Sequence, residues 1–596
     1  MSGKKFEGSQ EWYLGLDVGT NSVGWAATDS EYNVLKFNGN ATWGIYLFDE
    51  AKNAADRRVS RTARRRLQRK KQRIAMLQDF FAEEIANVDD QFYVRLKESQ
   101  LWSDDRTSGI DNHLFVGGEL NDKVYNTKYP TIHHLIWELM ESTDPHDPRL
   151  VYMACSYILS HRGHFLFDVD ENNVDKVTDF QNIYDGFMSW FHSYEIDMPW
   201  KCSADAFGVI MKKKQSVGKK EKDFFDLLFD GKKPADEEGK VSVKSIISFL
   251  SGRKTKISDL FLNEAYQTLE NESISITSLN LEDELDALSV EIDDIEYDLL
   301  TKLKCIYDWS VLVDVLMGEK DISKSKVNVY EQHRQDVYFL KHIIKLYAPD
   351  KYNAMFRELG KEKNYASYSY NAKDLGKNSA LSSDFKMCSA EDFCKFVDAI
   401  VKPLETTISE KESEQFADML ERLTLRTFCP KQVTSDNRVI PFQLYYFELK
   451  KILENASTYL PFLNVKDEYG TTAEKILSIM KFRIPYYVGP LTSSKNSEYA
   501  WMVRKSEGKI TPWNFDEMID KNKSEENFIR RMTTTCSYYA GADVLPKNSL
   551  LYAKYTVLNE INNIRINENK ILPEIKQGIY ENLFMKKRNI SVKNIK

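Results

Sequence analysis

The strongest constraint on this chain is a run of ten cations that contains no acid. Residues 57–73 read RRVSRTARRRLQRKKQR, in a chain of 596 residues whose formal net charge is -8. Subtracting the +10 of the run leaves about -18 on the other 579 residues (596 minus 17). The positive charge is therefore concentrated in one segment rather than spread along the chain.

The run is predicted to be helical, because it holds no Gly or Pro and consists mainly of strong helix formers. A helical wheel leaves one narrow apolar stripe, formed by Val59, Ala63, Leu67 and Ile74. Like charges four residues apart destabilise an isolated helix. A polyanion along its sides would remove that cost by counterion release and bidentate guanidinium–phosphate contacts. The pattern predicts a helix that lies against nucleic acid.

Two plainer readings of the run are a solvated surface helix and a disordered basic tail. Solvated helix faces usually interleave both signs of charge, and a disordered tail would lack the apolar stripe. Both therefore fit this run less well than a nucleic-acid-binding helix.

Composition places the chain among soluble proteins with several domains. Apolar residues make up 42% and charged residues 29% of its 596 positions. The seven cysteines form no C-x-x-C pair, which argues for reduced thiols and against structural zinc. No apolar stretch approaches membrane-spanning length, and the start MSGKKFEGSQ has no apolar signal core. We expect a soluble, cytoplasmic protein.

The first fifty residues differ from the rest. Residues 12–18 and 23–28 read as two strands of a hairpin around the turn signal Gly19-Thr-Asn21, and residues 42–48 read as a third strand. The chain then turns helical, with a helix over 131–140 behind a Thr131 cap and another over 151–159 that stops near Gly163. The predicted fold class is mostly α, with a small β start.

Further along, three segments read as loops and one as a helix. Residues 281–300 carry nine acids among regularly spaced apolar residues, which indicates a solvated amphipathic helix rather than a metal site. The predicted loops are 212–222, 230–240 and 365–383.

One carboxylate stands where it can carry chemistry. Asp17 lies on an apolar strand just before a tight glycine turn, in G-L-D-V-G-T-N-S-V-G-W. In RNase H-like nucleases such a carboxylate binds magnesium for phosphodiester cleavage, whereas in the actin and sugar-kinase class a D-x-G-T hairpin wraps nucleotide phosphates. An Asp at a hairpin end also has local hydrogen-bonding reasons to be there. The arginine-rich helix favours the nuclease, because a nucleotide kinase has no use for it.

Two later segments, 482–491 and 500–515, mix aromatic and basic residues around Pro and Gly. Such residues suit stacking and phosphate contact with RNA or a hybrid duplex. A buried core of loops and strands fits the same composition, so both readings stay open here.

Several motifs in order resemble the N-terminal part of the type II CRISPR-associated RNA-guided DNA endonucleases, the Cas9 family. They span nearly the whole chain and comprise Gly15–Trp25, Arg61–Arg66 with the cations to Arg73, Tyr129–Ile132, Arg162–Leu166, Phe482–Leu491, Lys505–Phe515 and Val544–Tyr552.

The resemblance implies an incomplete RNase H-like (RuvC-like) start, an arginine-rich bridge helix and a large α-helical recognition lobe. The implied boundaries are 1–50 for the first RuvC-like segment, 51–80 for the bridge helix, 81–175 for the first part of the lobe, 176–303 for an inserted helical subdomain, 304–530 for the second part, and 531–596 for the start of a further helical subdomain.

The family also implies partners and roles. The bridge helix would grip the guide RNA (crRNA with tracrRNA), and the lobe would cradle the guide–target heteroduplex by shape while base pairing reads the target DNA. Asp17 would be the catalytic carboxylate that binds magnesium, with manganese as a substitute. The implied RNA contacts are Arg57, Arg58, Arg61, Arg64, Arg65, Arg66, Arg69, Lys70, Lys71 and Arg73, followed by Arg162, Arg426, Arg483 and Tyr486.

The expected function is thus RNA-guided DNA cleavage in antiviral defence. In the family the other RuvC-like ligands, the HNH nuclease and the PAM-reading domain come later than the position that matches Lys596. We therefore expect the isolated chain to be inactive as a nuclease, and a C-terminal half to be a further partner. The alternatives are a guide-RNA-binding module without cleavage and an actin- or sugar-kinase-like phosphotransferase.

Overall fold

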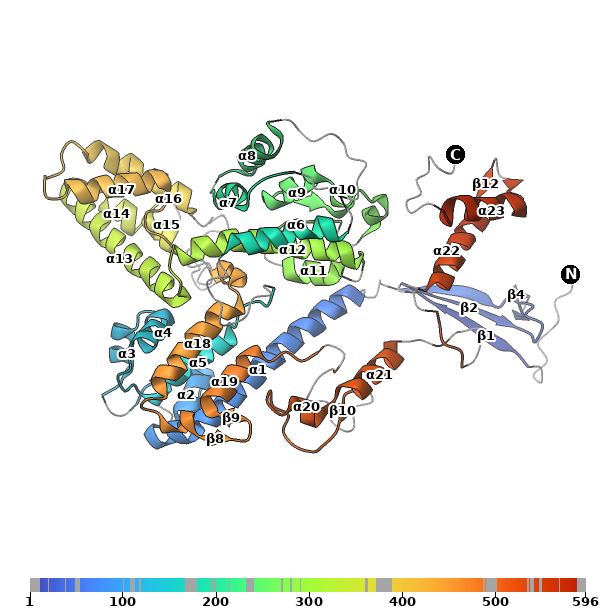
Figure 1. Ribbon diagram of the computed structural model, residues 1–596, viewed down its shortest axis with the longest axis horizontal. Helices are drawn as coiled ribbons and strands as arrows, with labels where there is room; N and C mark the ends of the chain where they lie inside the picture. Colours follow the sequence, from blue (N-terminus) through green and yellow to red (C-terminus); the bar gives the residue numbers. More distant parts are fainter. Residues whose placement is uncertain are drawn as a thin grey trace. The chain divides into compact units, whose positions relative to one another are not determined.

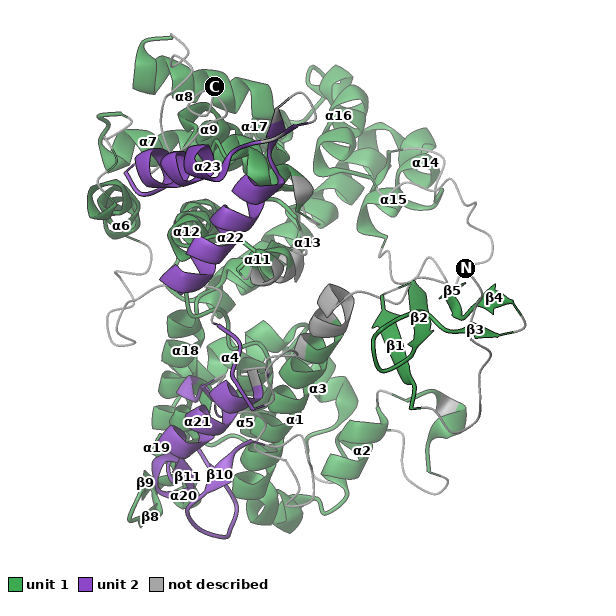
Figure 2. Cartoon of the chain, turned by 90° about the vertical axis from the view of Figure 1, so that its right-hand side faces the viewer, with its two compact units in different colours: residues 1–480 green, residues 481–596 purple. Residues whose placement is uncertain are grey.

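The computed structural model describes most of residues 11–586. The positions that it leaves out within that range are 20, 38, 49–53, 100, 108–112, 117–118, 167–178, 195, 197–199, 214, 232–240, 270–271, 279–280, 290, 360–362, 371–387, 433, 486–487, 489–500, 533–534, 536–540, 546–548 and 567–568. The chain forms two compact units, residues 1–480 and 481–596, which Figure 2 draws in green and purple.

Unit 1 begins with a three-stranded antiparallel sheet (Figure 1). Its strands are β1 (Tyr13–Val18), β2 (Ser22–Thr28) and β5 (Trp43–Leu47), in the order β1-β2-β5. A short ribbon of β3 (Lys36–Phe37) and β4 (Asn40–Ala41) lies in the connection between β2 and β5. The hairpin and the third strand predicted from the sequence are confirmed.

The arginine-rich run lies in α1 (Ala54–Val88), a helix of 35 residues that is drawn in blue in Figure 1. The helix prediction is confirmed, and α1 continues well beyond the run. Its C-terminal half packs against α5 (Pro148–Ser160) through buried apolar side chains. Phe81 makes edge-to-face contacts with Tyr152 at 5.8 Å and with Phe462 at 5.0 Å between ring centroids.

The helices that follow make up most of unit 1. They are α2 (Phe92–Glu98), α3 (Asp122–Lys128), α4 (Ile132–Glu141), α6 (Phe180–Ser193), α7 (Ala204–Lys212), α8 (Val217–Phe229), α9 (Val243–Leu250), α10 (Ile257–Leu260), α11 (Leu281–Leu288), α12 (Asp294–Leu316), α13 (Ile322–Tyr347), α14 (Tyr352–Phe356), α15 (Tyr365–Ser369), α16 (Ala390–Val401), α17 (Ser413–Leu425), α18 (Phe442–Ala456) and α19 (Thr472–Lys481). The short β6–β7 (Thr255–Lys256, Ser273–Ile274) and β8–β9 (Lys466–Asp467, Gly470–Thr471) ribbons join them. The mostly α fold class is confirmed.

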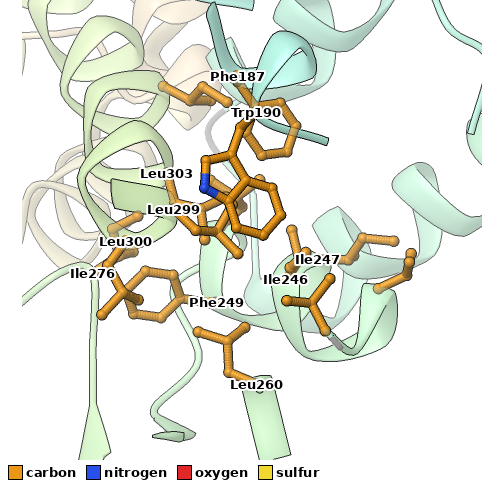
Figure 3. Packing of buried hydrophobic residues seen from close by; sticks show 14 of the residues in the cluster. Phe187, Trp190, Ile246, Ile247, Phe249, Leu260, Ile276, Leu299, Leu300 and Leu303 are labelled. Carbon is orange, nitrogen blue, oxygen red and sulfur yellow. The ribbon is translucent and has the colours of Figure 1, made fainter. Parts of the chain in front are cut away.

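Residues 180–309 close a large hydrophobic core of their own (Figure 3). Trp190 of α6 is 2% exposed and lies beside Phe187 and the leucines of α12. Its indole Nε1 donates a hydrogen bond to the carbonyl of Ile295 at 3.0 Å. A second core joins α13 to α17 over residues 337–429.

Three sequence predictions need correction. Residues 217–222, predicted as loop, are helical in α8, because Phe224 of that helix is fully buried and packs on the core. Residues 281–300 form two helices instead of one, since the chain breaks after α11 and Asp293 starts α12 with a capping box. Residues 365–369, predicted as loop, form α15, whereas 371–383 and 232–240 lie outside the described residues.

The predicted Thr131 cap is wrong in its hydrogen bond. Thr131 is the N-cap of α4, but its side chain makes no cap bond. Its Oγ1 instead lies 2.8 Å from Nδ1 of His134 in the first turn.

Unit 2 holds short elements around small cores. They are β10 (Val503–Arg504), α20 (Phe515–Met518), β11 (Ile519–Asp520), α21 (Lys521–Met532), α22 (Leu550–Asn563), β12 (Arg565–Ile566), β13 (Asn569–Lys570), α23 (Pro573–Ile579) and a π-helical turn over Tyr580–Phe584. One core joins Val488, Phe515, Met518 and Ile519, with Phe482 packed against it. None of the helices in the described ranges of the whole chain is long and apolar enough to cross a bilayer.

Candidate nucleic-acid interface

Helix α1 divides into a cationic half and an apolar half. In the apolar half Leu77, Phe81 and Ile85 are each at most 1% exposed, and their spacing of four residues puts them on one face. In the cationic half Leu67 is 55% exposed, so the predicted stripe is not buried there. The C-terminal half of α1 is thus embedded in unit 1, while described side chains of the cationic half, such as Arg61, Arg64 and Arg66, are exposed.

The predicted RNA contacts on α1 differ in exposure. Arg61, Arg64, Arg66 and Lys71 are exposed, and Arg65, Arg69, Lys70 and Arg73 are partly buried. Arg57 and Arg58 lie within the helix, and their side chains are outside the described residues. One continuous helix therefore brings all ten predicted cations together.

Burial and a neighbouring cation both lower the pKa of two of these arginines. Burial, followed by the charge of Arg69, lowers the pKa of Arg73 to about 10. Burial, followed by the charge of Arg65, lowers the pKa of Arg69 as well. In both cases the guanidinium is penalised by lost solvent and a neighbouring cation, and phosphate oxygens would relieve both penalties.

Arg73 also ties α1 to its neighbour. Its Nε donates to the carbonyl oxygen of Leu159 at 3.2 Å, near the C-terminal end of α5. A cation is favourable at that end of a helix, where the last carbonyls lack intrahelical partners. Arg73 therefore contributes one donor, its Nε, to the contact between α1 and α5.

The end of α5 brings a second predicted contact, Arg162, close to the same region. Its guanidinium stacks on Phe165 at 4.8 Å from the ring centroid, and its Nη1 donates to the carbonyl of Met480 at 3.1 Å. Gly163 beside it has φ +75°, and a Cβ there would lie 2.5 Å from the carbonyl oxygen of Ile440. Glycine is required here because the chain turns in the left-handed region against another backbone.

The remaining predicted RNA contacts do not belong to α1. Arg426 follows α17 with φ 62° and forms an ion pair with Glu391 at 2.9 Å, in the 337–429 core region. Arg483 is exposed in unit 2, and Tyr486 lies outside the described residues. Phe482 packs edge-to-face on Phe515 at 5.2 Å, so this part of the aromatic segment contributes to a core.

Asp17 occupies the place on the sheet that the sequence predicts. It lies on β1 opposite Gly24 of β2, which in turn pairs with Ile45 of β5. Its side chain is exposed, and Gly24 leaves space beside it because glycine has no side chain. Magnesium prefers several oxygen ligands, but among the described residues no group of three or more His, Cys, Asp or Glu is placed to hold a metal. Asp17 by itself fits one ligand of such a site and not a complete one.

Comparison with known protein families decides the identity of this helix and of the region after it. Residues 57–89 match the family described as the bridge helix of CRISPR-associated endonuclease Cas9, and residues 179–596 match the REC lobe of that endonuclease. The chain belongs to the Cas9 family. The resemblance deduced from the ordered motifs is confirmed.

Two curated relatives carry the name CRISPR-associated endonuclease Cas9. The protein of Listeria innocua serovar 6a is 33% identical over 609 residues, which cover 98% of this chain and 42% of the relative. The protein of Streptococcus mutans serotype c is 33% identical over 605 residues, which cover 97% of this chain and 41% of the relative. The chain thus spans about two fifths of the length of the curated Cas9 proteins that it matches.

The Cas9 bridge-helix match covers both halves of α1 and extends to Asp89, a residue that sequence reasoning missed. Asp89, directly after α1, contacts two buried arginines, Arg95 and Arg149. The sequence Asp147-Pro148-Arg149 gives a helix-start signal. Nothing in it indicates that Arg149 meets Asp89, because the two are 60 residues apart.

Proposed function

We propose that this chain is the guide-binding, N-terminal portion of a CRISPR RNA-guided DNA endonuclease. Its α1 binds the sugar–phosphate backbone of the guide RNA, and the REC lobe holds the guide–target heteroduplex by shape. The observation that carries the proposal is the cationic half of α1, with ten cations and no acid in residues 57–73. The burial and the neighbouring charge that lower the pKa of Arg69 and Arg73 support it, since such a site gains from a polyanion.

The nuclease part of the proposal rests on Asp17 and its sheet. Asp17 would supply one oxygen ligand to magnesium, or to manganese, and the metal would stabilise the oxygens of the phosphodiester being cut. The sheet itself supports a larger domain, because Leu16 is 60% and Tyr46 is 70% exposed on its outer strands. Further strands or helices of a RuvC-like domain would cover these side chains. We propose that such an enzyme works in the cytoplasm against foreign DNA.

Salt-dependent binding tests the guide-binding role. Filter-binding titrations would compare a structured crRNA–tracrRNA guide with a size-matched control RNA across a salt series. The triple variant R65A/R66A/R69A should bind the guide more weakly, with a slope of log K against log salt that is shallower by about 2–3, because each lost phosphate contact lowers it by about 0.7–0.9.

A charge-matched control removes three exposed lysines from another region, K219A/K222A/K244A. This variant loses the same charge and should keep the slope of the parent chain. Equal slopes for the arginine triple variant and the parent would refute the assignment of α1. If the chain binds the guide but a mixture with a supplied C-terminal half shows no magnesium-dependent cleavage, the chain is a guide-binding module. If the mixture does cleave, D17N should abolish RuvC-type cleavage and leave guide binding unchanged.

A further inference from the structure

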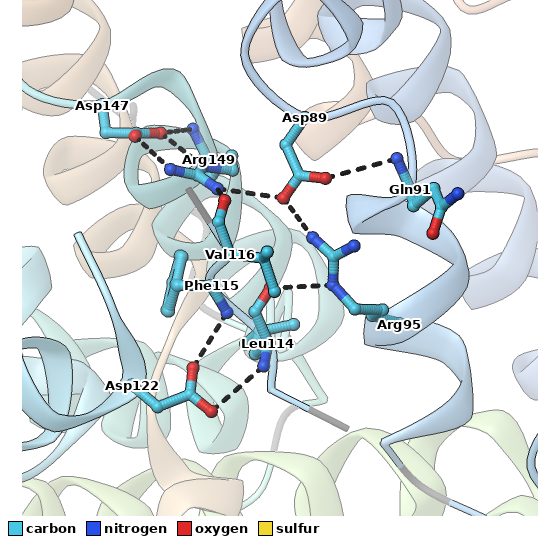
Figure 4. A network of polar contacts seen from close by, with 9 residues as sticks. All are labelled: Asp89, Gln91, Arg95, Leu114, Phe115, Val116, Asp122, Asp147 and Arg149. Carbon is cyan, nitrogen blue, oxygen red and sulfur yellow. Dashed lines mark hydrogen bonds and ion pairs between the residues drawn. The ribbon is translucent and has the colours of Figure 1, made fainter. Parts of the chain in front are cut away.

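The C-terminal end of α1 meets the start of α5 at a charge cluster in which Arg149 and Asp89 are buried (Figure 4). Asp147 caps α5 and accepts from Nε and Nη2 of Arg149 at 3.0 and 2.7 Å, so it fixes the plane of that guanidinium. Nη1 of Arg149 then donates to Oδ2 of Asp89 at 3.0 Å and to the carbonyl of Val116 at 3.3 Å. The side chains of Arg149 and Asp89 are 2% and 7% exposed.

Asp89 places a carboxylate at the C-terminal end of a helix, where a negative charge is unusual. Its backbone N–H donates to the carbonyl of Ile85 at 2.7 Å, so it extends the C-terminal end of α1. A negative side chain is unfavourable at that end of a helix, where the backbone dipoles already place negative charge. Two buried guanidiniums, those of Arg149 and Arg95, both contact its Oδ2 and offset this cost. The cluster therefore depends on the arginines that α2 and α5 supply.

Arg149 is committed to the fold rather than to a ligand, because its side chain is only 2% exposed. A guanidinium carries five N–H donors, and Arg149 makes four hydrogen bonds within the cluster. Its charge is also balanced, because Asp89 and Asp147 face Arg149 and Arg95, two acids against two cations. Any effect of Arg149 on a bound nucleic acid must act through the position of α1.

The contacts between α1 and α5 explain how Arg149 can influence the position of α1. Polar contacts lie near both ends of the packing of α1 on α5, Arg73 to Leu159 at one end and Asp89 to Arg149 at the other. The sixteen residues between Arg73 and Asp89 correspond to about 24 Å of helix. Two fixed points at that separation hold both the axial position and the rotation of α1 on α5. Apolar packing alone tolerates rotation more readily, since it is not directional.

We propose that Arg149 is a positioning residue for guide binding, which holds Asp89 and thereby sets where the cationic half of α1 presents its arginines. This inference rests on the proposed guide-binding function. It predicts that a change at Arg149 alters the preference for a structured guide without removing a phosphate contact. Contact residues such as Arg65 behave differently, because their loss lowers the salt slope.

The test compares R149K with the parent chain in guide and control-RNA titrations across a salt series. Lysine keeps the charge but lacks the planar fork, so one ammonium cannot join Asp147, Asp89 and Val116 together. We expect the preference for the guide over the control RNA to fall roughly tenfold, with a change in salt slope of less than one. Each protein is measured at a temperature where thermal unfolding shows it to be fully folded.

R422K is the matched control, because Arg422 also binds a buried carboxylate bidentately, Asp336 of α13, but away from α1. It should lose stability and keep the guide preference. The positioning role would be overturned if R149K kept the guide preference, or if R422K lost as much of that preference as R149K. A salt slope of R149K that is reduced by one or more would overturn it as well. If R149K does not fold, D89N serves instead, since Asn keeps an amide oxygen for Arg149. A parent chain without guide preference would refute the proposed function itself, and the positioning role with it.

Discussion

The N-terminal sheet and the 180–309 core differ in how far they bury their apolar side chains. In the sheet, three strands satisfy each other's backbone hydrogen bonds, but Leu16 and Tyr46 remain 60% and 70% exposed. In the 180–309 core, Phe187 and Ile246 are 0% exposed because helices pack on them from several sides. Of these three strands only the central β2 is paired on both sides, and burial of the apolar side chains needs a second layer. The helical region provides its own second layer.

The largest predicted contrast between the two regions concerns apolar truncation. W190A should lower the free energy of unfolding of the helical region by about 3–5 kcal/mol, because it removes a buried indole and leaves a cavity. L16A in the sheet should change it by less than about 0.5 kcal/mol, since Leu16 is already solvated. Urea unfolding followed by circular dichroism measures both. Similar losses for the two variants would show that the sheet is covered in solution.

A second contrast concerns pH, because the helical body buries titratable groups. Glu448 of α18 is 1% exposed and accepts from the backbone N–H and Oγ of Ser323 at 2.7 and 3.0 Å. Burial raises its pKa from 4.5 to about 7. Because the folded chain favours the protonated carboxyl group, protonation of Glu448 stabilises the fold fully below pH 4.5. This stabilisation is lost as pH rises through 7. The difference amounts to about 3 kcal/mol.

We therefore expect E448Q to gain stability relative to the parent chain as pH rises from 4.5 to 8, in urea unfolding at a series of pH values. D17N, a change of an exposed sheet carboxylate, is the control and should follow the parent. A parallel pH curve for E448Q would contradict the burial of a titrating Glu448.

His133, linked to Glu448 through Ser323, titrates in the opposite sense. Its Nδ1 lies 3.1 Å from Ser323 Oγ, and burial lowers its pKa to about 3. The folded chain favours the neutral ring of His133, so this ring contributes its full stabilisation above pH 6.5. That stabilisation is lost as pH falls towards 3. H133N should therefore lose less stability on acidification than the parent chain. A steeper acid loss in H133N would contradict this assignment.

A small local effect is predicted in the sheet. Gly44 of β5 pairs with Trp25 of β2, and a Cβ at position 44 would lie 3.1–3.3 Å from the indole. G44A should cost about 1 kcal/mol or less, because the indole is 40% exposed and can shift. Hydrogen exchange of the β2 and β5 amides measures this local change. A loss as large as that of W190A would mean that the indole is held firmly by a second layer.

Sequence reasoning succeeded where the signal is local. The strands around Asp17, the helix that carries the cations and the mostly α body follow from residue types and short spacings. It failed where burial elsewhere decided the outcome. The lysine-rich 217–222 segment is helical because Phe224, further along the same helix, is buried in the 180–309 core. Leu67, predicted to lie on an apolar stripe, is exposed because the packing face of α1 begins at Leu77.

The cationic helix after a small β start follows from the residue pattern alone, and the ordered motifs indicate the Cas9 family. Periodicity and charge act over a few residues, so they can be read directly. Only the tertiary structure decided that Asp89 meets Arg149, that Arg73 reaches the end of α5, and that Glu448 is buried against Ser323. These contacts join residues 60, 86 and 125 positions apart. Partners at such separations are chosen by the packing of whole helices, which no local pattern encodes.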